Sequence, residues 1–375
     1  MSEAPLAGLK VVELARILAG PWAGQVLADL GAEVIKVEAP EGDETRRWGP
    51  PFVENDDGTR DAAYFHAANR GKSSVTADFR NSADVARVKA LIAEADVVIE
   101  NFKVGGLAKY GLDYASLVSQ QPGLVYCSIT GFGQDGPYAH RAGYDFVIQG
   151  MSGIMDLTGD PAGEPQKIGV AFADIMTGLY AVIAIQAALA LRARTGRGQH
   201  IDMALLDVMT GVLANQALNY LVSGVSPGRM GNAHPNIAPY AAFPASDGWF
   251  ILAVGSDAQF RRACHSLHRD DLAEDPRFKT NADRVRHRDL LSAALRKTTA
   301  TMSRDQLLAA LEAAGVPAGP INTVAEALAD PQVQHRALAL TLPGGTPGVR
   351  TPIRLSDAPL LLDRPAPRLG AANDR

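Results

Sequence analysis

The sequence is poor in cysteine, in excess basic charge and in long apolar runs. Cys127 and Cys264 are the only cysteines among 375 residues, too few for a disulfide framework or a four-cysteine zinc site. Lys and Arg number 36 against 41 Asp and Glu, a formal net charge of −5, and no extended basic block occurs. We therefore expect a reducing compartment and no nucleic-acid partner.

The sequence also lacks a clear membrane or export signal. Its most apolar stretch, Leu179 to Leu191, contains Gln186 and is followed by Arg192, so it is shorter than the roughly 20 residues of a membrane span. The first five residues have neither a cationic start nor an apolar core. We expect a cytoplasmic protein with no membrane contact.

What is present is an alternation of short apolar strands and amphipathic helices. Composition is that of a globular protein, with 47% hydrophobic and 21% charged residues. Helices are expected from Gly20 to Leu30, from Ala83 to Ala95, and from about Asp207 to Val222. The expected strands are Leu9–Leu14, Glu33–Val37, Val97–Glu100 and Leu124–Ile129. This alternation predicts an α/β fold, with a Rossmann-like parallel sheet in a large domain.

A change of composition predicts a second, smaller α/β domain. Residues 223–239 are rich in Gly, Pro, Asn and His, which is typical of a boundary. A strand at Trp249–Val254 and helices at Ala258–His268, Arg288–Thr299 and Arg304–Ala314 follow, and the tail beyond Pro343 is rich in proline. We predict domains at 1–225 and 226–325, with residues 326–375 as an extended C-terminal strap.

Three motifs resemble ligand sites but lack part of the pattern. Gly131-Phe-Gly133-Gln-Asp-Gly136 follows a strand, but no apolar periodicity follows it to form the helix that a dinucleotide site requires. Gly71-Lys72-Ser73 lacks the earlier glycine of a phosphate-binding loop. His265 and His268 beside Cys264 are typical of a solvated helix face. An NAD-dependent oxidoreductase is therefore the least favoured alternative, and we predict no metal.

A single carboxylate lies in an otherwise apolar run. Asp174 is the only charged residue between Gly169 and Leu191. Burial of an unpaired carboxylate costs several kcal/mol and raises its pKa unless donors compensate. Asp174 stands where a helix N-cap belongs, and a cap alone would explain it. A functional carboxylate is the other interpretation, and the two are compatible because a helix N-terminus keeps a carboxylate ionised and nucleophilic.

A set of segments is spread along nearly the whole chain: Leu18–Pro21, Leu30–Lys36, Glu100–Phe102, Gly131–Pro137, Gly143–Asp145, Asp174–Tyr180, Thr195–Gln199 and Gly315–Pro320. In this order they are similar to segments of the family III coenzyme A transferases, also called the formyl-CoA and carnitine CoA-transferase or CaiB/BaiF family. Four segments most resemble members that transfer CoA from succinyl-CoA to dicarboxylates such as glutarate: Gly143–Phe146, Gly169–Asp174, Ala233–Tyr240 and Arg277–Asn281.

The resemblance implies a mechanism and an assembly. Asp174 would be the covalent nucleophile, which passes through a mixed anhydride and an aspartyl-CoA thioester. The partners implied are an acyl-CoA and a carboxylic acid, with CoA as co-substrate and no tightly bound cofactor. The C-terminal strap would return to the large domain, and two chains would interlock as a homodimer.

The resemblance also implies contacts with CoA. Relatives seat the CoA backbone at Arg16 and Ala19, and Asn101 and Phe102 could hold the adenine end at the ligand edge of a parallel sheet. Cations would meet its phosphates, although each of them is by default a solvated surface residue. Ala39 stands where relatives often have a basic residue. The full set of CoA-binding candidates is Arg16, Ala19, Ala77, Arg80, Asn101, Phe102, Lys109 and Asp145.

Tyr144 and Asp145 bear on a second activity. Acyl-CoA racemases of the same superfamily have His followed by Asp at this place and use that His as a base. A tyrosine with an ordinary pKa of about 10 is a poor base at neutral pH, which favours the transferase over the racemase. Tyr144 is expected either to donate a hydrogen bond to a developing oxyanion or only to pack against the sheet.

Two arginines are candidates for binding the acceptor. Arg46 and Arg47 lie in the polar loop Glu41–Trp48, and a guanidinium suits the distal carboxylate of a dicarboxylate. The identity of the acids stays open, because short dicarboxylates differ by a methylene or a hydroxyl. A non-catalytic CoA-binding protein is the alternative from another functional class.

Overall fold

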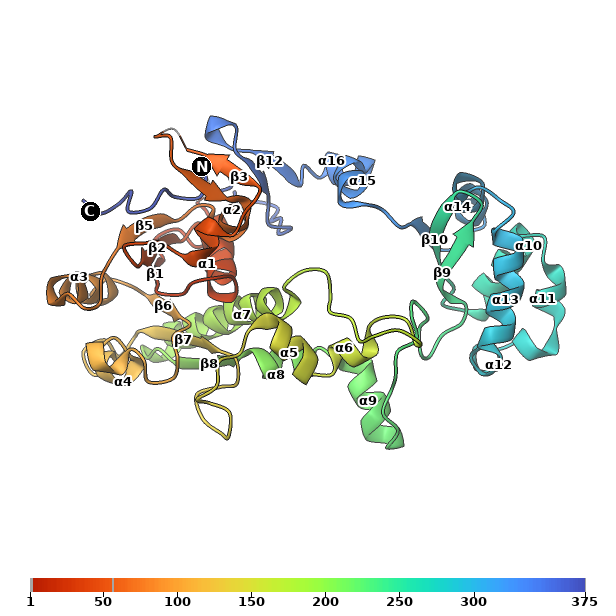
Figure 1. The fold of residues 1–375 in the computed structure, drawn as a ribbon, viewed down its shortest axis with the longest axis horizontal. Coiled ribbons are helices and arrows are strands. Elements are labelled where there is room, and N and C mark those ends of the chain that lie inside the picture. The colour runs from red at the N-terminus through yellow and green to blue at the C-terminus, as the bar shows by residue number, and fades with distance from the viewer. Residues whose placement is uncertain (1–2, 56, 375) are drawn as a thin grey trace. The chain divides into compact units, whose positions relative to one another are not determined.

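A computed structural model describes residues 3–55 and 57–374, which form two compact units (Figure 1). The large unit comprises the described residues of 1–154, 167–225 and 332–375, and the small unit comprises 155–166 and 226–331. Sequence reasoning set the boundaries at 225 and 325 and assigned 155–166 to the large domain. This last segment joins the small unit because Arg229 forms an ion pair with Asp156 at 2.9 Å and Gly231 N–H donates to the Gly159 carbonyl.

A six-stranded parallel sheet organises the large unit and confirms the expected α/β class. Its spatial order is β5-β2-β1-β6-β7-β8. The order reverses between β1 and β6, and ligands of open parallel sheets bind beyond the carboxyl ends of the strands at such a switch point. The strands are β1 (Lys10–Glu13), β2 (Glu33–Glu38), β5 (Ser73–Thr76), β6 (Val97–Glu100), β7 (Val125–Thr130) and β8 (His200–Ala204).

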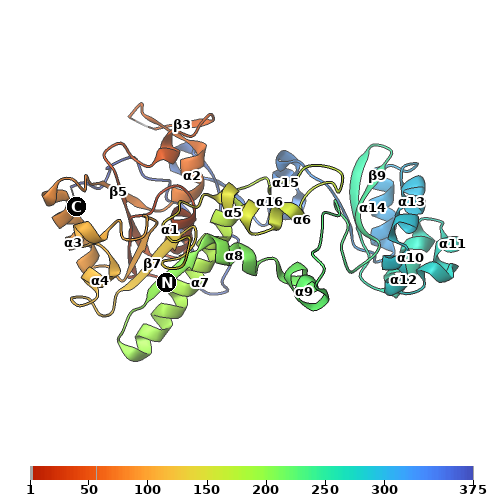
Figure 2. The ribbon, with the colours of Figure 1, turned by 60° about the horizontal axis from the view of Figure 1, so that its bottom comes forward.

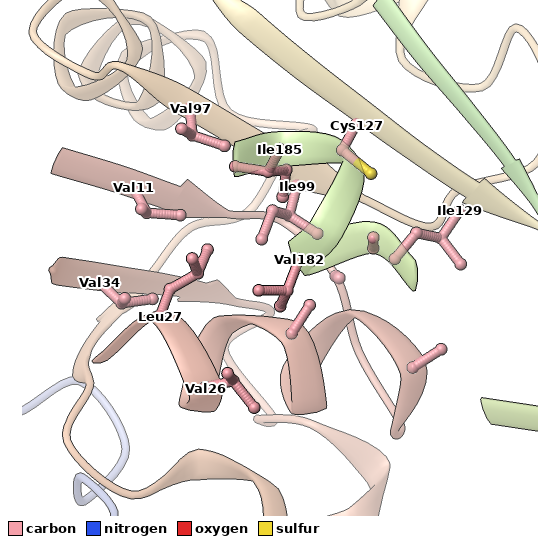
Figure 3. Close-up of a cluster of buried hydrophobic side chains, with 14 of the residues drawn as sticks. Val11, Val26, Leu27, Val34, Val97, Ile99, Cys127, Ile129, Val182 and Ile185 are labelled. Carbon is pink, nitrogen blue, oxygen red and sulfur yellow. The ribbon is translucent and has the colours of Figure 1, made fainter. Parts of the chain in front are cut away.

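Helices cover both faces of this sheet because alternate strand residues point to opposite sides. Val11 of β1 packs with α1 (Ala19–Asp29) and α7 (Phe172–Thr195), in the cluster of buried side chains shown in Figure 3. Its neighbour Val12 packs with Val88 and Ile92 of α3 (Ser82–Ala93) on the other face. The catalytic candidate Asp174 is therefore carried by a helix of the central core.

Helix α7 is long and apolar enough, by length and composition, to cross a membrane, with a mean hydropathy of 1.7. It packs against the sheet through Ala181 and Ile185, which are fully buried. At its end Arg192 pairs with Asp96 at 2.9 Å. We interpret α7 as a core helix of an α/β fold of the soluble type.

The remaining helices and hairpins of the large unit are short. The expected long helix over 207–222 is wrong, because Ala214 adopts a left-handed conformation with φ of +46° and two helices form. The elements are η1 (Glu44–Arg47), β3 (Phe52–Glu54), β4 (Arg60–Ala62), α2 (Ala63–Asn69), η2 (Ala108–Tyr110), α4 (Tyr114–Leu117), α5 (Asp145–Met151), α6 (Ile154–Leu157, whose last residues join the small unit), α8 (Leu205–Gly211) and α9 (Ala214–Ser223).

The C-terminal segment runs along the large unit. It contains α16 (Pro331–His335), β12 (Ala339–Thr341), η4 (Pro343–Gly345) and β13 (Pro347–Val349), and residues 350–368 form neither helix nor strand. Leu361 N–H donates to the Asp29 carbonyl at 2.9 Å, and Ala372 N–H donates to the Ser74 carbonyl at 2.9 Å.

The small unit has an antiparallel sheet of order β11-β10-β9 covered by helices (Figure 2). The expected strand and three expected helices are present in it. Arg284 is fully buried among its helices and pairs with Asp257 at 2.7 Å. The elements are β9 (Tyr240–Ala245), β10 (Gly248–Ala253), α10 (Asp257–Ser266), α11 (Asp270–Glu274), η3 (Pro276–Phe278), α12 (Asn281–Arg286), α13 (Arg288–Thr299), α14 (Arg304–Ala313), β11 (Ala318–Pro320) and α15 (Val324–Ala329).

Candidate active site

Two adjoining cavities lie at the carboxyl ends of β1 and β6, where the strand order reverses. The smaller, of about 180 Å³, is lined by Asp174 together with Tyr144, Asp145 and Asn101. The larger, of about 610 Å³, is lined by segments that follow β1, β2 and β5. The two cavities share the lining residues Arg16, Glu44 and Phe102. An elongated ligand can therefore extend from one into the other.

Asp174 does not cap its own helix. It is the third residue of α7, and Ala171 precedes the helix without a side-chain cap. Asp145, from α5, supplies the cap: its Oδ1 accepts from the backbone N–H of Ala173 at 2.7 Å and of Asp174 at 3.4 Å. The Asp174 carboxylate accepts no hydrogen bond from the described residues and lines the smaller cavity.

The pKa of Asp174 is raised to about 7, first by burial and then by the negative charge of Asp145. We expected the helix N-terminus to keep this group ionised. Burial and the second carboxylate outweigh that effect, and no cation is paired with Asp174 among the residues that the structure describes. A carboxylate that is costly to ionise is also a strong base and nucleophile once it has lost its proton.

Two tyrosines belong to the surroundings of this carboxylate. Tyr144 lines the smaller cavity and is 66% exposed. Tyr64, from α2, lies near enough to Asp174 and Asp145 that their charges, after burial, help raise its phenol pKa to about 12. Sequence reasoning missed Tyr64, since a single aromatic residue in a short helix resembles a core residue. Its ring packs edge-on against Trp48 at 5.3 Å.

The loop from Arg16 to Ala19 forms one wall of the smaller cavity. The Asn101 side chain bonds both backbone polar groups of Arg16. Its Oδ1 accepts from the Arg16 N–H at 3.0 Å, and its Nδ2 donates to the Arg16 carbonyl at 2.7 Å. The Arg16 guanidinium forms an ion pair with Glu44 at 2.6 Å. Asn101 thus positions the cavity wall as well as lining the cavity.

The larger cavity brings together most of the other CoA candidates. Ala77, Arg80 and Phe102 line it, and the Phe102 ring stacks on Phe79 with centroids 6.0 Å apart. Arg80 is exposed and paired with Asp78 at 2.8 Å. Ala39 also lines this cavity. Lys109 does not line it, but its Nζ lies 4.8 Å from the ring centre of the lining residue Tyr110. A flat aromatic group and anions both find suitable side chains there.

The two loop arginines have different surroundings. Arg47 lines the larger cavity and not the smaller one that contains Asp174. Arg46 is 5% exposed and lines neither cavity. Its guanidinium pairs with Glu38 at 2.7 Å and with Asp61 at 3.0 Å and lies over the Phe65 ring. The geometry therefore gives Arg46 a structural role, contrary to our expectation, because its donors are occupied by buried acids.

Within residues 3–55 and 57–374, no group of three or more His, Cys, Asp or Glu side chains is arranged to hold a metal ion. The glycine motif at 131–136 is followed by a loop up to α5 and not by the helix of a dinucleotide site.

Comparison with known proteins identifies the family. The sequence matches CoA-transferase family III over residues 6–373. The chain belongs to this family. The "Succinate--glutarate CoA-transferase" of Agrobacterium fabrum is 59% identical over 98% of this chain and 93% of that protein. The "Succinyl-CoA:glutarate CoA-transferase" of Homo sapiens is 41% identical over 98% and 84%.

A solved structure agrees with this family III CoA-transferase over its whole length. A CaiB/BaiF family protein from Brucella suis has 65% identity and a TM-score of 0.91, with 100% of this chain and 98% of that chain covered. The fold class and the enzyme class expected from the sequence are confirmed, with CoA as co-substrate.

Proposed function

We propose that this CoA-transferase moves CoA from succinyl-CoA to glutarate or a similar short dicarboxylate, with Asp174 as the covalent nucleophile. The names of the Agrobacterium and human relatives support the substrates. The assignment of Asp174 as nucleophile is supported by its carboxylate, which has a raised pKa and no partner among residues 3–55 and 57–374. It lines a cavity that adjoins one large enough for the nucleotide end of CoA.

The transfer proceeds by exchange of acyl bonds. The Asp174 carboxylate attacks the donor thioester carbonyl, the C–S bond breaks, and CoA leaves as a thiolate from a mixed anhydride. The thiolate then attacks the Asp174 carbonyl carbon, which releases succinate and leaves an aspartyl-CoA thioester. The acceptor carboxylate reverses these two steps, so that Asp174 is regenerated. No net proton is consumed, and only the ionised form of Asp174 starts the cycle.

The surrounding side chains have distinct roles in this scheme. Asp145 holds the first turn of α7 and so fixes the direction of the nucleophile. Tyr144, which lines the cavity, and Tyr64, whose pKa is raised in part by the charge of Asp174, are the candidate hydroxyl donors to the oxyanion that develops at each attacked carbonyl. The larger cavity takes the adenine and phosphates against Phe102 and Arg80, with Ala19 beside the pantetheine arm.

The second carboxylate of the acceptor requires a cation near Asp174. Arg141 lines the same cavity, and its guanidinium lies 4.4 Å from the Tyr138 ring centre. No acidic side chain among the described residues pairs with Arg141, whereas Arg16 is paired with Glu44. We assign acceptor binding to Arg141, because Arg47 lines the larger cavity and not the one that contains Asp174. Arg141→Met is expected to raise the KM for glutarate at least about tenfold and to leave the KM for succinyl-CoA unchanged; equal changes would contradict the assignment.

Trapping of the intermediate tests the function directly. Protein incubated with succinyl-CoA should gain the mass of CoA less one water, and hydroxylamine should then convert Asp174 to a hydroxamate that peptide mass spectrometry locates. Asp174→Asn should show neither product. The matched control is Asp207→Asn, which changes an exposed acid in the first turn of α8 and should react like the wild type. A non-catalytic CoA-binding protein would show no adduct, and a panel of acids in the same assay identifies the acceptor.

A homodimer in the cytoplasm completes the proposal. Exposed apolar side chains gather on the two helices that carry Asp145 and Asp174, among them Phe146 at 58% and Ile183 at 62% exposure. Burial of such surface is the usual basis of a stable dimer. Light scattering should give twice the chain mass of 39.6 kDa, and Ile183→Glu should lower it toward one chain.

A further inference from the structure

A left-handed backbone conformation occurs in the wall of the smaller cavity. Ile17 has a φ of +70°, and it lies between Arg16 and Leu18, all three of which line the cavity with Asp174. For a β-branched residue this conformation is a genuine outlier, because Cβ crowds the backbone. Such strain persists only where surrounding contacts enforce it.

Asp43 supplies the enforcing contact. The Ile17 N–H donates to Asp43 Oδ2 at 3.1 Å. Asp43 is itself 3% exposed and fixed from two further directions: Lys36 Nζ lies 3.0 Å from Oδ2, and Thr45 donates to Oδ1 from its N–H at 3.0 Å and its hydroxyl at 2.8 Å. Lys36 and Thr45 together hold the pKa of Asp43 below its ordinary value although burial acts in the opposite direction.

The path of the chain at Ile17 determines how α1 meets α7. Helix α1 begins at Ala19, two residues after Ile17. The Ala19 carbonyl oxygen lies only 2.7 Å from where a Cβ on Gly178 would stand, so the two helices touch at backbone distance. Gly178 follows Asp174 by four residues in α7, which places both on the same face one turn apart.

We propose that Asp43 is a positioning residue for the transfer reaction: it holds Ile17 in its left-handed conformation and thereby fixes the wall from Arg16 to Ala19 against the helical turn that carries Asp174. Asp43 lines the larger cavity and not the one with Asp174, so it acts through the loop. The inference rests on the proposed role of Asp174 as nucleophile.

Substitution of Asp43 tests this role against a matched control. Asp43→Asn replaces one acceptor oxygen by an N–H donor that faces other donors, and it should lower kcat about tenfold or more. Asp29→Asn is the control, because Asp29 is 1% exposed, pairs with Arg70 at 2.6 Å and lies at the other end of α1. Both variants should lose thermal stability, but Asp29→Asn should keep kcat within about twofold of the wild type.

Two substitutions at Ile17 separate positioning from general stability. Glycine adopts a positive φ without strain. Ile17→Gly should therefore restore kcat in the Asp43→Asn background to within about threefold of the wild type, while the melting temperature stays low. Ile17→Pro fixes φ near −65° and removes the N–H donor. It should reproduce the loss of kcat with the Lys36–Asp43 ion pair intact, even if Asp43→Asn does not fold.

The outcomes distinguish this inference from the proposed function. Wild-type protein that forms no CoA adduct with succinyl-CoA would refute the function and this inference with it. A wild-type adduct with equal kcat in Asp43→Asn and Asp29→Asn would refute the positioning role alone. Full activity in Ile17→Pro, or no recovery in the Asp43→Asn, Ile17→Gly double variant, would refute it as well.

Discussion

The cost of burying Asp174 close to a second carboxylate, Asp145, should be measurable as protein stability. Its pKa rises from 3.8 to about 7 on folding. A carboxyl group whose folded-state pKa is raised favours the folded state less and less as pH rises, because the unfolded chain releases the proton first. The penalty begins near the unfolded pKa of 3.8 and levels off above about pH 7.

The magnitude follows from the shift. Each tenfold change in acid dissociation constant is worth about 1.4 kcal/mol, so ionised Asp174 costs about 2 to 4 kcal/mol above pH 7, allowing for its partial contact with solvent. Asp174→Asn removes the charge. The variant should therefore be more stable than the wild type at pH 8, although it is inactive, as is common for active-site substitutions. The difference between the free energies of unfolding of Asp174→Asn and the wild type should grow by about 1 to 3 kcal/mol between about pH 5 and pH 8.

Urea unfolding of both proteins at several pH values provides the measurement, with the difference between their midpoints as the quantity of interest. Asp207→Asn gives the reference for an acid-to-amide change in an exposed first helical turn. A difference that stays constant with pH, or an Asp174→Asn protein that is less stable than the wild type at pH 8, would show that the carboxylate is not strained by its surroundings.

Three further predictions concern residues around the site. Asp145→Asn removes the second cause of the raised pKa of Asp174, so the acidic limb of the kcat/KM–pH profile should move to lower pH; an unmoved limb would leave burial as the sole cause. Arg80→Ala should raise the KM for the CoA thioester but not for the acid, measured by initial rates, and equal effects would argue against phosphate binding. Arg46→Met leaves Glu38 buried without its partner and should destabilise the protein by about 3 to 5 kcal/mol in urea unfolding, whereas an unchanged stability with a raised acceptor KM would restore the substrate role.

Hydrophobic patterning predicted the sheet but not its connections. Every residue of the strand Val97–Glu100 is buried. Short, mostly apolar runs of this kind, bounded by polar residues, predict buried strands from the sequence alone. Helices α2 and α5, with seven residues each, are too short to show a helical period, and they carry Tyr64 and Asp145. The break at Ala214 depends on one backbone dihedral angle that an alanine does not signal.

The site was predictable to the extent that each residue acts alone. An isolated acid in an apolar run marked Asp174 without any knowledge of its neighbours. The carboxylate of Asp145 caps α7 by accepting from the Ala173 N–H, 28 residues away in the sequence. The burial of Arg46 depends on ion pairs with Glu38 and Asp61, which lie on two different strands. Spacing along the chain does not reveal contacts between residues that are distant in sequence. Arg46, in a polar loop where a solvated side chain was expected, is therefore buried in the structure.

The hydrogen bonds between the C-terminal segment and β5 affect solubility as well as shape. Strand β5 is the outermost strand of the sheet beside β2, and its free edge would be open to strand addition by other molecules. Gly370 N–H donates to Ser74 Oγ at 3.0 Å, and Asn373 Oδ1 accepts from Thr76 N–H at 2.8 Å. The last few residues thus shield that edge from aggregation. Their partners Ser74 and Thr76 lie just before Ala77, which lines the larger cavity. A chain trimmed at this end would therefore tend to self-associate and to bind its nucleotide substrate more weakly.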